Sequence, residues 1–115
     1  MVIRKEEQKL EIRTRMREGN GEVQMRELLP AERFCGHGRL FSLITLEPGC
    51  SIGRHAHVGE SETFFLLQGT ARLDDNGVER TLHAGDVAHT PSGESHAIEN
   101  AGEEPLVLVA MIVKA

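Results

Sequence analysis

Apolar and polar residues alternate in short runs along most of this 115-residue chain. Such runs are typical of β-strands, because successive side chains of a strand point to opposite faces. Turns rich in glycine, proline and asparagine separate the runs. The pattern predicts a strand around His55 and further strands at residues 22–28, 40–46, 62–67, 71–73, 78–83, 87–90, 95–99 and 106–113.

The connections between these strands are also informative. The segment Asp74-Asp-Asn-Gly77 is typical of a type I′ hairpin turn, because asparagine and glycine tolerate the left-handed backbone that this turn requires. A turn at Leu29-Pro30 and a short helical or irregular stretch up to Gly38 follow the first strand. Many short strands, 12 glycines and a length that suits one core predict a single all-β barrel or sandwich.

The N-terminal segment has a different composition. Charged side chains dominate it, with Leu10, Ile12 and Met16 between them, and it ends at Gly19-Asn-Gly21. This pattern predicts either a short amphipathic helix or an arm that lies on a neighbouring subunit. We therefore divide the chain into a charged N-terminal arm, residues 1–21, and a β-barrel domain, residues 22–115.

The last predicted strand is apolar on both faces. Its sequence, Leu-Val-Leu-Val-Ala-Met-Ile-Val, needs cover on each side, and only one side can fill the barrel. Together with Phe41, Leu43 and Phe65, the other side predicts a homodimer. The alternative is a monomer whose N-terminal arm covers this face.

Charge and composition limit the partners and the location. The net charge of −5 argues against a nucleic-acid partner, because phosphate binding needs a basic surface. No apolar run is long enough for a membrane span, so no membrane partner is expected. The start, Met-Val-Ile-Arg-Lys-Glu-Glu, lacks the apolar stretch of a secretory signal, which predicts a cytoplasmic protein. Cys35 and Cys50 are too few for a disulfide framework and are expected to be free thiols.

Three histidines and one glutamate form a candidate metal site. His55 and His57 are two residues apart, so both side chains point to one face of an extended strand. Glu62 follows a glycine-containing interruption, and His96 follows a Pro-x-Gly turn far along the chain. Imidazole nitrogens and a carboxylate oxygen suit one divalent transition metal and leave positions for water or substrate. Iron, manganese, nickel, zinc and copper all remain candidates.

Other polar residues accompany this set. Glu60 competes with Glu62 for the carboxylate position, but the spacing favours Glu62, and we expect Glu60 and Arg54 to be charges at the rim. Alternation places His89 on the face of Val87, which we expect to point inward, so His89 is our candidate catalytic proton donor; the alternative is an outward-facing histidine. We expect two more histidines, His37 and His83, to be exposed. Phe64 and Leu66 are expected to line an apolar pocket beside Glu62. Cys50 is expected to be either a plain thiol or a redox-sensitive residue that flanks the cavity.

The spacing of these residues resembles a known family. The two segments read Gly49-x5-His55-x-His57-x4-Glu62-x6-Gly69 and Gly85-x5-Pro91-x-Gly93-x2-His96-x3-Asn100, and they resemble the two motifs of the cupin superfamily without a gap. The short stretch between them is similar to that of small single-domain bacterial cupins, some of which are labelled oxalate-decarboxylase-like. The resemblance implies a double-stranded β-helix, or jelly-roll barrel, and a metal held by His55, His57, Glu62 and His96.

The resemblance leaves the function open between classes. The first is a metalloenzyme that acts on a small organic acid or oxygenated carbon compound as a dioxygenase, decarboxylase or lyase. Its general acid or base would be His89 or Glu60, because the chain has no tyrosine or tryptophan. The alternatives are a non-catalytic module that binds or senses a small molecule, and a protein in which the metal is structural.

Overall fold

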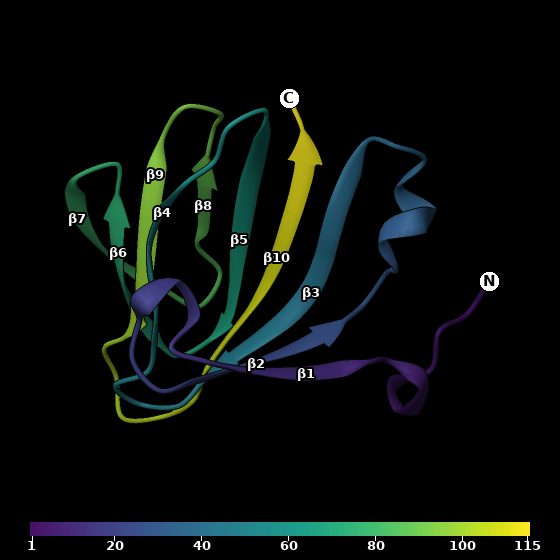
Figure 1. Ribbon diagram of the computed structural model, residues 1–115. Coiled ribbons are helices and arrows are strands. Elements are labelled where there is room, and N and C mark those ends of the chain that lie inside the picture. Colours follow the sequence, from purple (N-terminus) through teal and green to yellow (C-terminus); the bar gives the residue numbers. More distant parts are fainter.

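The computed structural model covers residues 1–115 and consists of two antiparallel sheets packed face to face (Figure 1). The six-stranded sheet has the order β1-β2-β3-β10-β5-β8, and the four-stranded sheet has the order β4-β9-β6-β7. The strands are β1 (Leu10–Thr14), β2 (Glu22–Glu27), β3 (Gly38–Leu46), β4 (Ser51–Ala56), β5 (Glu60–Gln68), β6 (Thr70–Asp75), β7 (Val78–His83), β8 (Val87–Thr90), β9 (Ser95–Asn100) and β10 (Leu106–Lys114).

The remaining regular elements are single 3₁₀ turns. They are η1 (Lys5–Glu7), η2 (Met16–Glu18) and η3 (Ala31–Phe34). No helix is long and apolar enough to cross a membrane. The all-β prediction and the double-stranded β-helix that the resemblance implied are both confirmed.

The core lies between the sheets and follows from the alternation in the sequence. On β5, Glu62, Phe64 and Leu66 point inward and are at most 6% exposed, as predicted from their shared face. On β10, Leu108, Ala110 and Ile112 do the same. Burial of these apolar side chains supplies about 1.5 to 3 kcal/mol for each large residue, which makes the two sheets one cooperative unit.

The predicted hairpin between β6 and β7 is confirmed. Asp75 pairs with Val78, so Asn76 and Gly77 alone form the turn, with φ angles of 49° and 93°. Two positive φ angles at the central positions define a type I′ turn, whose twist matches that of the flanking strands. The Gly77 amide also donates to Asp74 Oδ1 at 2.7 Å.

The helix prediction for the N-terminal arm is wrong. Residues Leu10–Thr14 form β1, which pairs with β2 from Leu10↔Arg26 to Thr14↔Glu22. The arm then turns through η2 and lies against β4 of the same barrel (Figure 1). A contact of the arm with a neighbouring subunit stays a prediction. The arm is an edge strand because the backbone of β2 offers an unpaired hydrogen-bonding edge, and strand pairing satisfies the arm's amides along its length.

The outer face of the six-stranded sheet is apolar, and the arm reaches it beside Leu43 of β3. Val109 of β10 lies beside Leu43 of β3 and Phe65 of β5, and Phe65 lies beside Val87 of β8. Phe65 and Val87 are 42% and 62% exposed, respectively. The arm of the same chain therefore does not provide the cover that the apolar strand requires, and the homodimer stays a prediction.

Candidate metal centre

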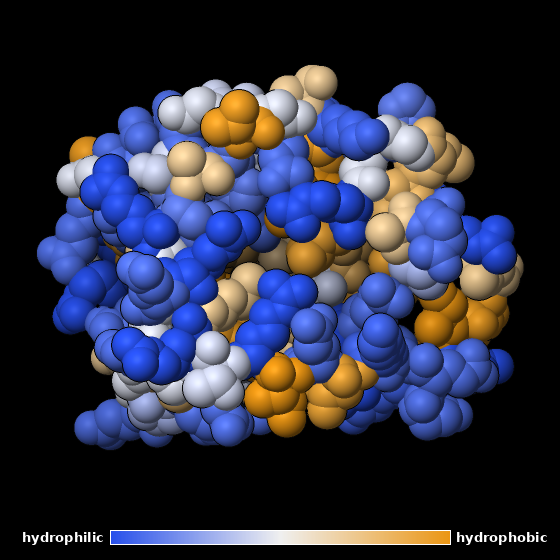
Figure 2. Space-filling model, viewed as in Figure 1, coloured by the Kyte–Doolittle hydropathy of each residue, from blue (hydrophilic) through white to orange (hydrophobic).

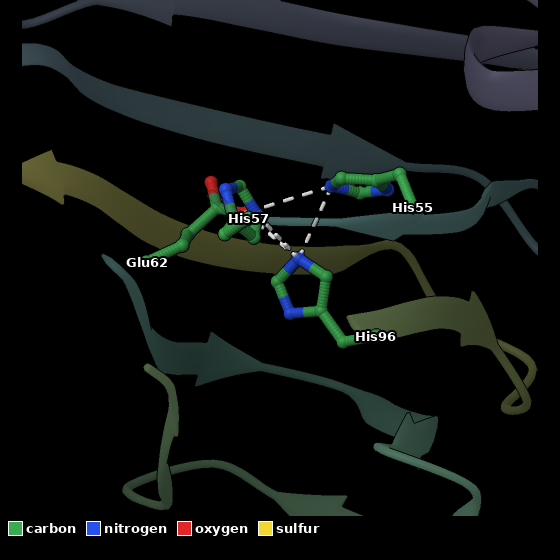
Figure 3. A group of neighbouring side chains, drawn as sticks. All are labelled: His55, His57, Glu62 and His96. Carbon is green, nitrogen blue, oxygen red and sulfur yellow. Dashed lines mark hydrogen bonds and ion pairs between the residues drawn. The ribbon is translucent and has the colours of Figure 1, made fainter. Parts of the chain in front are cut away.

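The four candidate ligands come together between the two sheets (Figure 3). His55 lies on β4 and faces His96 on the adjacent strand β9, and His57 follows the end of β4. Glu62 projects from β5 of the opposite sheet. His57, Glu62 and His96 are at most 6% exposed, and the side chain of His55 is 10% exposed. The barrel thus brings together residues that are up to 41 positions apart in sequence.

The ligand atoms converge on one point. His57 Nε2 lies 3.0 Å from Glu62 Oε1 and 3.1 Å from His96 Nε2. His96 Nε2 lies 2.9 Å from Glu62 Oε1 and 3.2 Å from His55 Nε2. The separation of His55 Nε2 from Glu62 Oε1 is wider, at 3.9 Å. Bonds of about 2.1 Å at right angles would separate neighbouring donors by about 3.0 Å, so the shorter distances fit a single metal ion.

Each histidine is oriented by a partner on its other nitrogen. His55 Nδ1 lies 2.8 Å from the Gly53 carbonyl oxygen, and His57 Nδ1 lies 3.2 Å from Glu60 Oε1. His96 Nδ1 lies 2.8 Å from Thr90 Oγ1. Metal-binding histidines in proteins regularly donate their second N–H in this way, which fixes the ring and directs the other nitrogen at the metal.

The protonation that these partners impose favours a cation at the centre. A carbonyl oxygen and an ionised carboxylate only accept hydrogen bonds, so the Nδ1 atoms of His55 and His57 carry the protons. When these rings are neutral, their Nε2 atoms carry lone pairs that face His96 Nε2 and the negative charge of Glu62. These groups repel one another unless protons or a metal ion lie between them. The donor set therefore fits one divalent transition metal.

The two carboxylates beside the centre are both held ionised. Burial on its own would raise the pKa of Glu62, but the imidazoles of His55, His96 and His57 outweigh it and lower this pKa to about 2. The Arg39 guanidinium, 2.7 Å from Glu60, lowers the pKa of Glu60 to about 2, with a further contribution from His57. Arg39, Glu60 and His57 thus form a chain of contacts that ends at the candidate metal ligand.

A cavity of about 60 Å³ adjoins the donors and is lined by the N-terminal arm on one side. His55, His57 and Glu62 contribute to its lining, together with Arg13, Arg17 and Arg39. The rest of the lining consists of methionine, leucine and isoleucine side chains. Figure 2 shows the molecule from the direction of Figure 1, with hydrophilic side chains around a recess that has apolar atoms at its bottom.

The structure corrects the prediction for His89. Thr90 and Ala88 of β8 face inward opposite Glu62 and Phe64, whereas His89 and Val87 are exposed on the outer face. The His89 Nδ1 atom lies 2.9 Å from Thr63 Oγ1 on that face. The inward orientation of His89 and Val87 is therefore wrong, and a catalytic role for His89 at this centre has no geometric support.

Other sequence predictions have clear outcomes. His37 and His83 are exposed, as predicted, and Arg54 is an exposed charge 3.5 Å from Asp74. Both cysteines are unpaired thiols, and Cys50 packs against the core. Glu60 is more than a rim charge, because it orients His57.

The sequence analysis did not identify two side chains that contact the candidate ligands or their partners. Thr90 is 2% exposed and contacts His96. It pairs with Glu62 across β5 and β8, so a correct prediction of this strand pairing would have placed Thr90 on the same inward face. Arg39 of β3 donates two hydrogen bonds to Glu60, and no local sequence pattern predicts this contact between residues that are 21 positions apart. Phe64, which was predicted to lie at the site, stacks on the His96 ring with centroids 4.9 Å apart and the planes 9° from parallel.

Comparisons with known proteins agree with this architecture. Residues 42–112 match the model of the cupin domain family. An oxalate-binding protein of Thermotoga maritima is 44% identical over 113 residues, which are 98% of this chain and 93% of that protein. Oxalate decarboxylase of Bacillus subtilis is 37% identical over 73 residues, which are 59% of this chain but only 19% of that enzyme.

A solved structure extends the similarity to the whole chain. The crystal structure of a Thermotoga maritima protein, described as a predicted oxalate decarboxylase, matches with a TM-score of 0.95 at 43% identity, and the match covers 100% of both chains. The family model spans most of the chain, and the oxalate-binding relative is similar to it in sequence over nearly its whole length. The chain belongs to the cupin family.

Proposed function

We propose that this protein binds one divalent transition metal through His55, His57, Glu62 and His96, and that the metal captures a small carboxylate of the oxalate class. The convergence of four ligand atoms, with each imidazole anchored at Nδ1, carries this proposal. Four protein ligands leave positions open on a six-coordinate ion. When bound, the metal would act as a Lewis acid that attracts carboxylate oxygens.

The cavity fits this class of ligand in size and charge. Its volume of about 60 Å³ is several times the space that one water molecule needs in a cavity, which suits a ligand of few non-hydrogen atoms. Arg13, Arg17 and Arg39 supply positive charge around it, although the chain as a whole has a net charge of −5. The relative named for oxalate binding supports the same choice of ligand.

The side chains that line the cavity favour binding of the carboxylate without its chemical conversion. Apart from the candidate metal ligands, the lining holds only arginines and apolar side chains, so no second group can take up or release a proton near neutral pH. Glu60 stays ionised and is occupied by Arg39 and His57. Metal-dependent decarboxylation or oxidation of the same acid is the second candidate, and the similarity to an oxalate decarboxylase favours it.

The location and the assembly belong to the same proposal. We place the protein in the cytoplasm, where a reducing environment suits its two unpaired thiols. We also propose a homodimer that buries the apolar outer face of β3, β10, β5 and β8. Exposed Phe65, Val87 and Met111 on that face support an interface.

Elemental analysis of the native protein beside His55→Ala and His89→Ala tests the metal site. His55→Ala removes the candidate ligand whose side chain is the most exposed of the four, and His89→Ala removes an exposed histidine outside the barrel. We expect about one equivalent of metal in the native protein and in His89→Ala, and none in His55→Ala. Equal metal content in all three proteins would refute the site.

Calorimetric titration of the metal-loaded protein with oxalate then tests the ligand. We expect saturable binding that His55→Ala abolishes together with the metal. Carbon dioxide, formate and oxygen are measured in the same samples, and their change over time would move the conclusion to the enzymatic function. Absence of oxalate binding by the metal-loaded native protein would refute the proposed ligand class.

A further inference from the structure

The N-terminal arm contributes directly to the wall of the cavity. Arg13 of β1 and Arg17 of η2 line it beside the candidate metal ligands. Neither residue belongs to the two motif segments that carry the ligands, which begin at Gly49. The arm therefore places charge at the centre without taking part in metal binding.

The three cavity arginines differ in their partners. Arg39 is bound to Glu60 by two hydrogen bonds of 2.7 and 2.8 Å, and Arg13 pairs with Glu11 at 3.0 Å. Arg17 makes no ion pair and no side-chain hydrogen bond. It is the one guanidinium in the lining whose five N–H donors are all free for an incoming anion.

The backbone that carries Arg17 is fixed against the strand of His55. The amide of Ser51 on β4 donates to the Asn20 carbonyl oxygen at 2.8 Å, and the amide of Asn20 donates to Ser51 Oγ at 2.9 Å. A Cβ atom at Gly53 would lie 1.9 Å from the Arg17 carbonyl oxygen, so only glycine at this position allows η2 to approach so closely. Arg17 itself has a left-handed φ of 54°, a costly conformation that these contacts maintain.

We propose that Arg17 is a specificity-determining residue, which selects small dicarboxylates over monocarboxylates at the metal centre. This inference rests on the proposed function. One carboxylate of the ligand binds the open side of the metal, and the guanidinium of Arg17 donates to the oxygens of the second carboxylate. A planar guanidinium forms paired, charge-assisted hydrogen bonds with a carboxylate, so a ligand with a single carboxylate gains nothing from it.

The same turn provides a matched control. Arg15 is also an exposed cation, with a nearly identical φ of 53°, but it does not line the cavity. Arg17→Gln and Arg15→Gln therefore remove the same charge from the same turn and share the same backbone strain. Any difference between the two variants reports on the position of the side chain at the cavity.

The test is calorimetric titration of manganese-loaded native, Arg17→Gln and Arg15→Gln protein with oxalate and with acetate. We expect Arg17→Gln to weaken oxalate binding about tenfold or more and acetate binding less than about threefold. Arg15→Gln should leave both affinities within about twofold of native. Metal content and the melting temperature are measured for each protein, and we expect both to be unchanged.

The outcomes separate this inference from the proposed function. If native protein binds oxalate and both variants bind it equally, the assignment of Arg17 is overturned and the proposed function stands. Loss of metal from Arg17→Gln also overturns the assignment, because the residue would then act on the metal site itself. If native protein binds neither anion, the proposed function fails and the assignment fails with it.

Discussion

The contact of Thr90 with His96 gives the most direct test of how the barrel prepares the metal site. Thr90→Val removes the hydroxyl that lies 2.8 Å from His96 Nδ1 and keeps the shape of the side chain. Thr90 is 2% exposed, so water does not replace the lost partner. With metal bound at Nε2, the proton of the neutral ring must stay on Nδ1, where it would be buried without an acceptor.

The metal-free protein can avoid this cost. There the His96 proton can move to Nε2 and be donated to Glu62 Oε1 at 2.9 Å, and Nδ1 then needs no acceptor. The substitution should therefore act on metal affinity more than on folding. A buried unpaired donor costs about 1 to 3 kcal/mol, and loss of such outer contacts weakens metal binding by about 10- to 100-fold.

The stacked ring of Phe64 still restrains His96 in the variant. We therefore expect the lower part of this range, a loss of about tenfold, or about 1.4 kcal/mol. The assay is competition for zinc or manganese with a chelating indicator, and denaturant unfolding of the metal-free proteins is measured in parallel. Thr90→Ser, which keeps a hydroxyl, should restore most of the affinity.

Thr63→Val is the matched control. Thr63 makes the same type of contact, to Nδ1 of His89 at 2.9 Å, but on the outer face of the sheet. We expect its metal affinity to equal that of the native protein. Thr90→Val and Thr63→Val with metal affinities within about threefold of each other would refute the argument that the hydroxyl positions a metal ligand.

Three further predictions follow from the same contacts. Glu60→Ala removes the acceptor of His57 Nδ1, so metal affinity in the indicator competition should fall about 10- to 100-fold; an unchanged affinity would contradict this role. The folded-state pKa of Glu60, about 2, lies below its ordinary value of 4.5, so its ionised form stabilises the fold above about pH 4.5, and this contribution is lost as the pH falls toward 2. In denaturant titrations at pH 5 and pH 3, the metal-free native protein should thus lose more unfolding free energy than Glu60→Gln, and equal losses would contradict the linkage. Phe65→Glu puts a charge into the apolar outer face and should yield a monomer in sedimentation with metal retained; a native protein that is itself monomeric would refute the dimer.

The strands and the candidate ligands could be predicted because burial restricts the residue types along a strand and metal binding restricts the types and spacing of the ligands. Most inward positions of a buried strand are apolar, and all the predicted strand limits lie within two residues of the observed ones, as for 40–46 against Gly38–Leu46. His55 and His57 are held on one face by their spacing. The type I′ turn was predictable because few residue types adopt its φ angles.

The orientation of β8 could not be predicted in the same way. Our expectation that Val87 points inward assumed that the apolar positions of a strand face the core. The outer face of this sheet is apolar as well, so apolar character no longer distinguishes the faces, and an error of one position exchanges all side chains between them. Thr90 was missed and His89 misplaced for this single reason.

The arm was mispredicted for a different reason. Its pairing with β2 uses backbone hydrogen bonds, which depend little on the side chains, and every residue of β1 is exposed. No buried face therefore appears in its sequence, and the charged residues with Leu10 and Ile12 between them are compatible with a helix as well as with an edge strand. Only the free edge of β2, which is a property of the whole sheet, decides between them.

This arrangement separates the holding of the metal from the choice of the ligand. His55, Glu62 and His96 lie on β4, β5 and β9, and His57 directly follows β4. The Nδ1 partners of the three histidines lie on β4, β5 and β8, whereas two of the cavity arginines lie on the arm. Changes in the arm can alter the charge of the cavity while the Nδ1 contacts of the three histidines stay intact. On this argument, substitutions in η2 should change which anion binds and leave metal affinity alone, whereas Thr90 and Glu60 variants should weaken metal binding first and anion binding only through it. A measured loss of metal in the arm variants, or normal metal binding in the Thr90 variant, would show that the two tasks are not divided in this way.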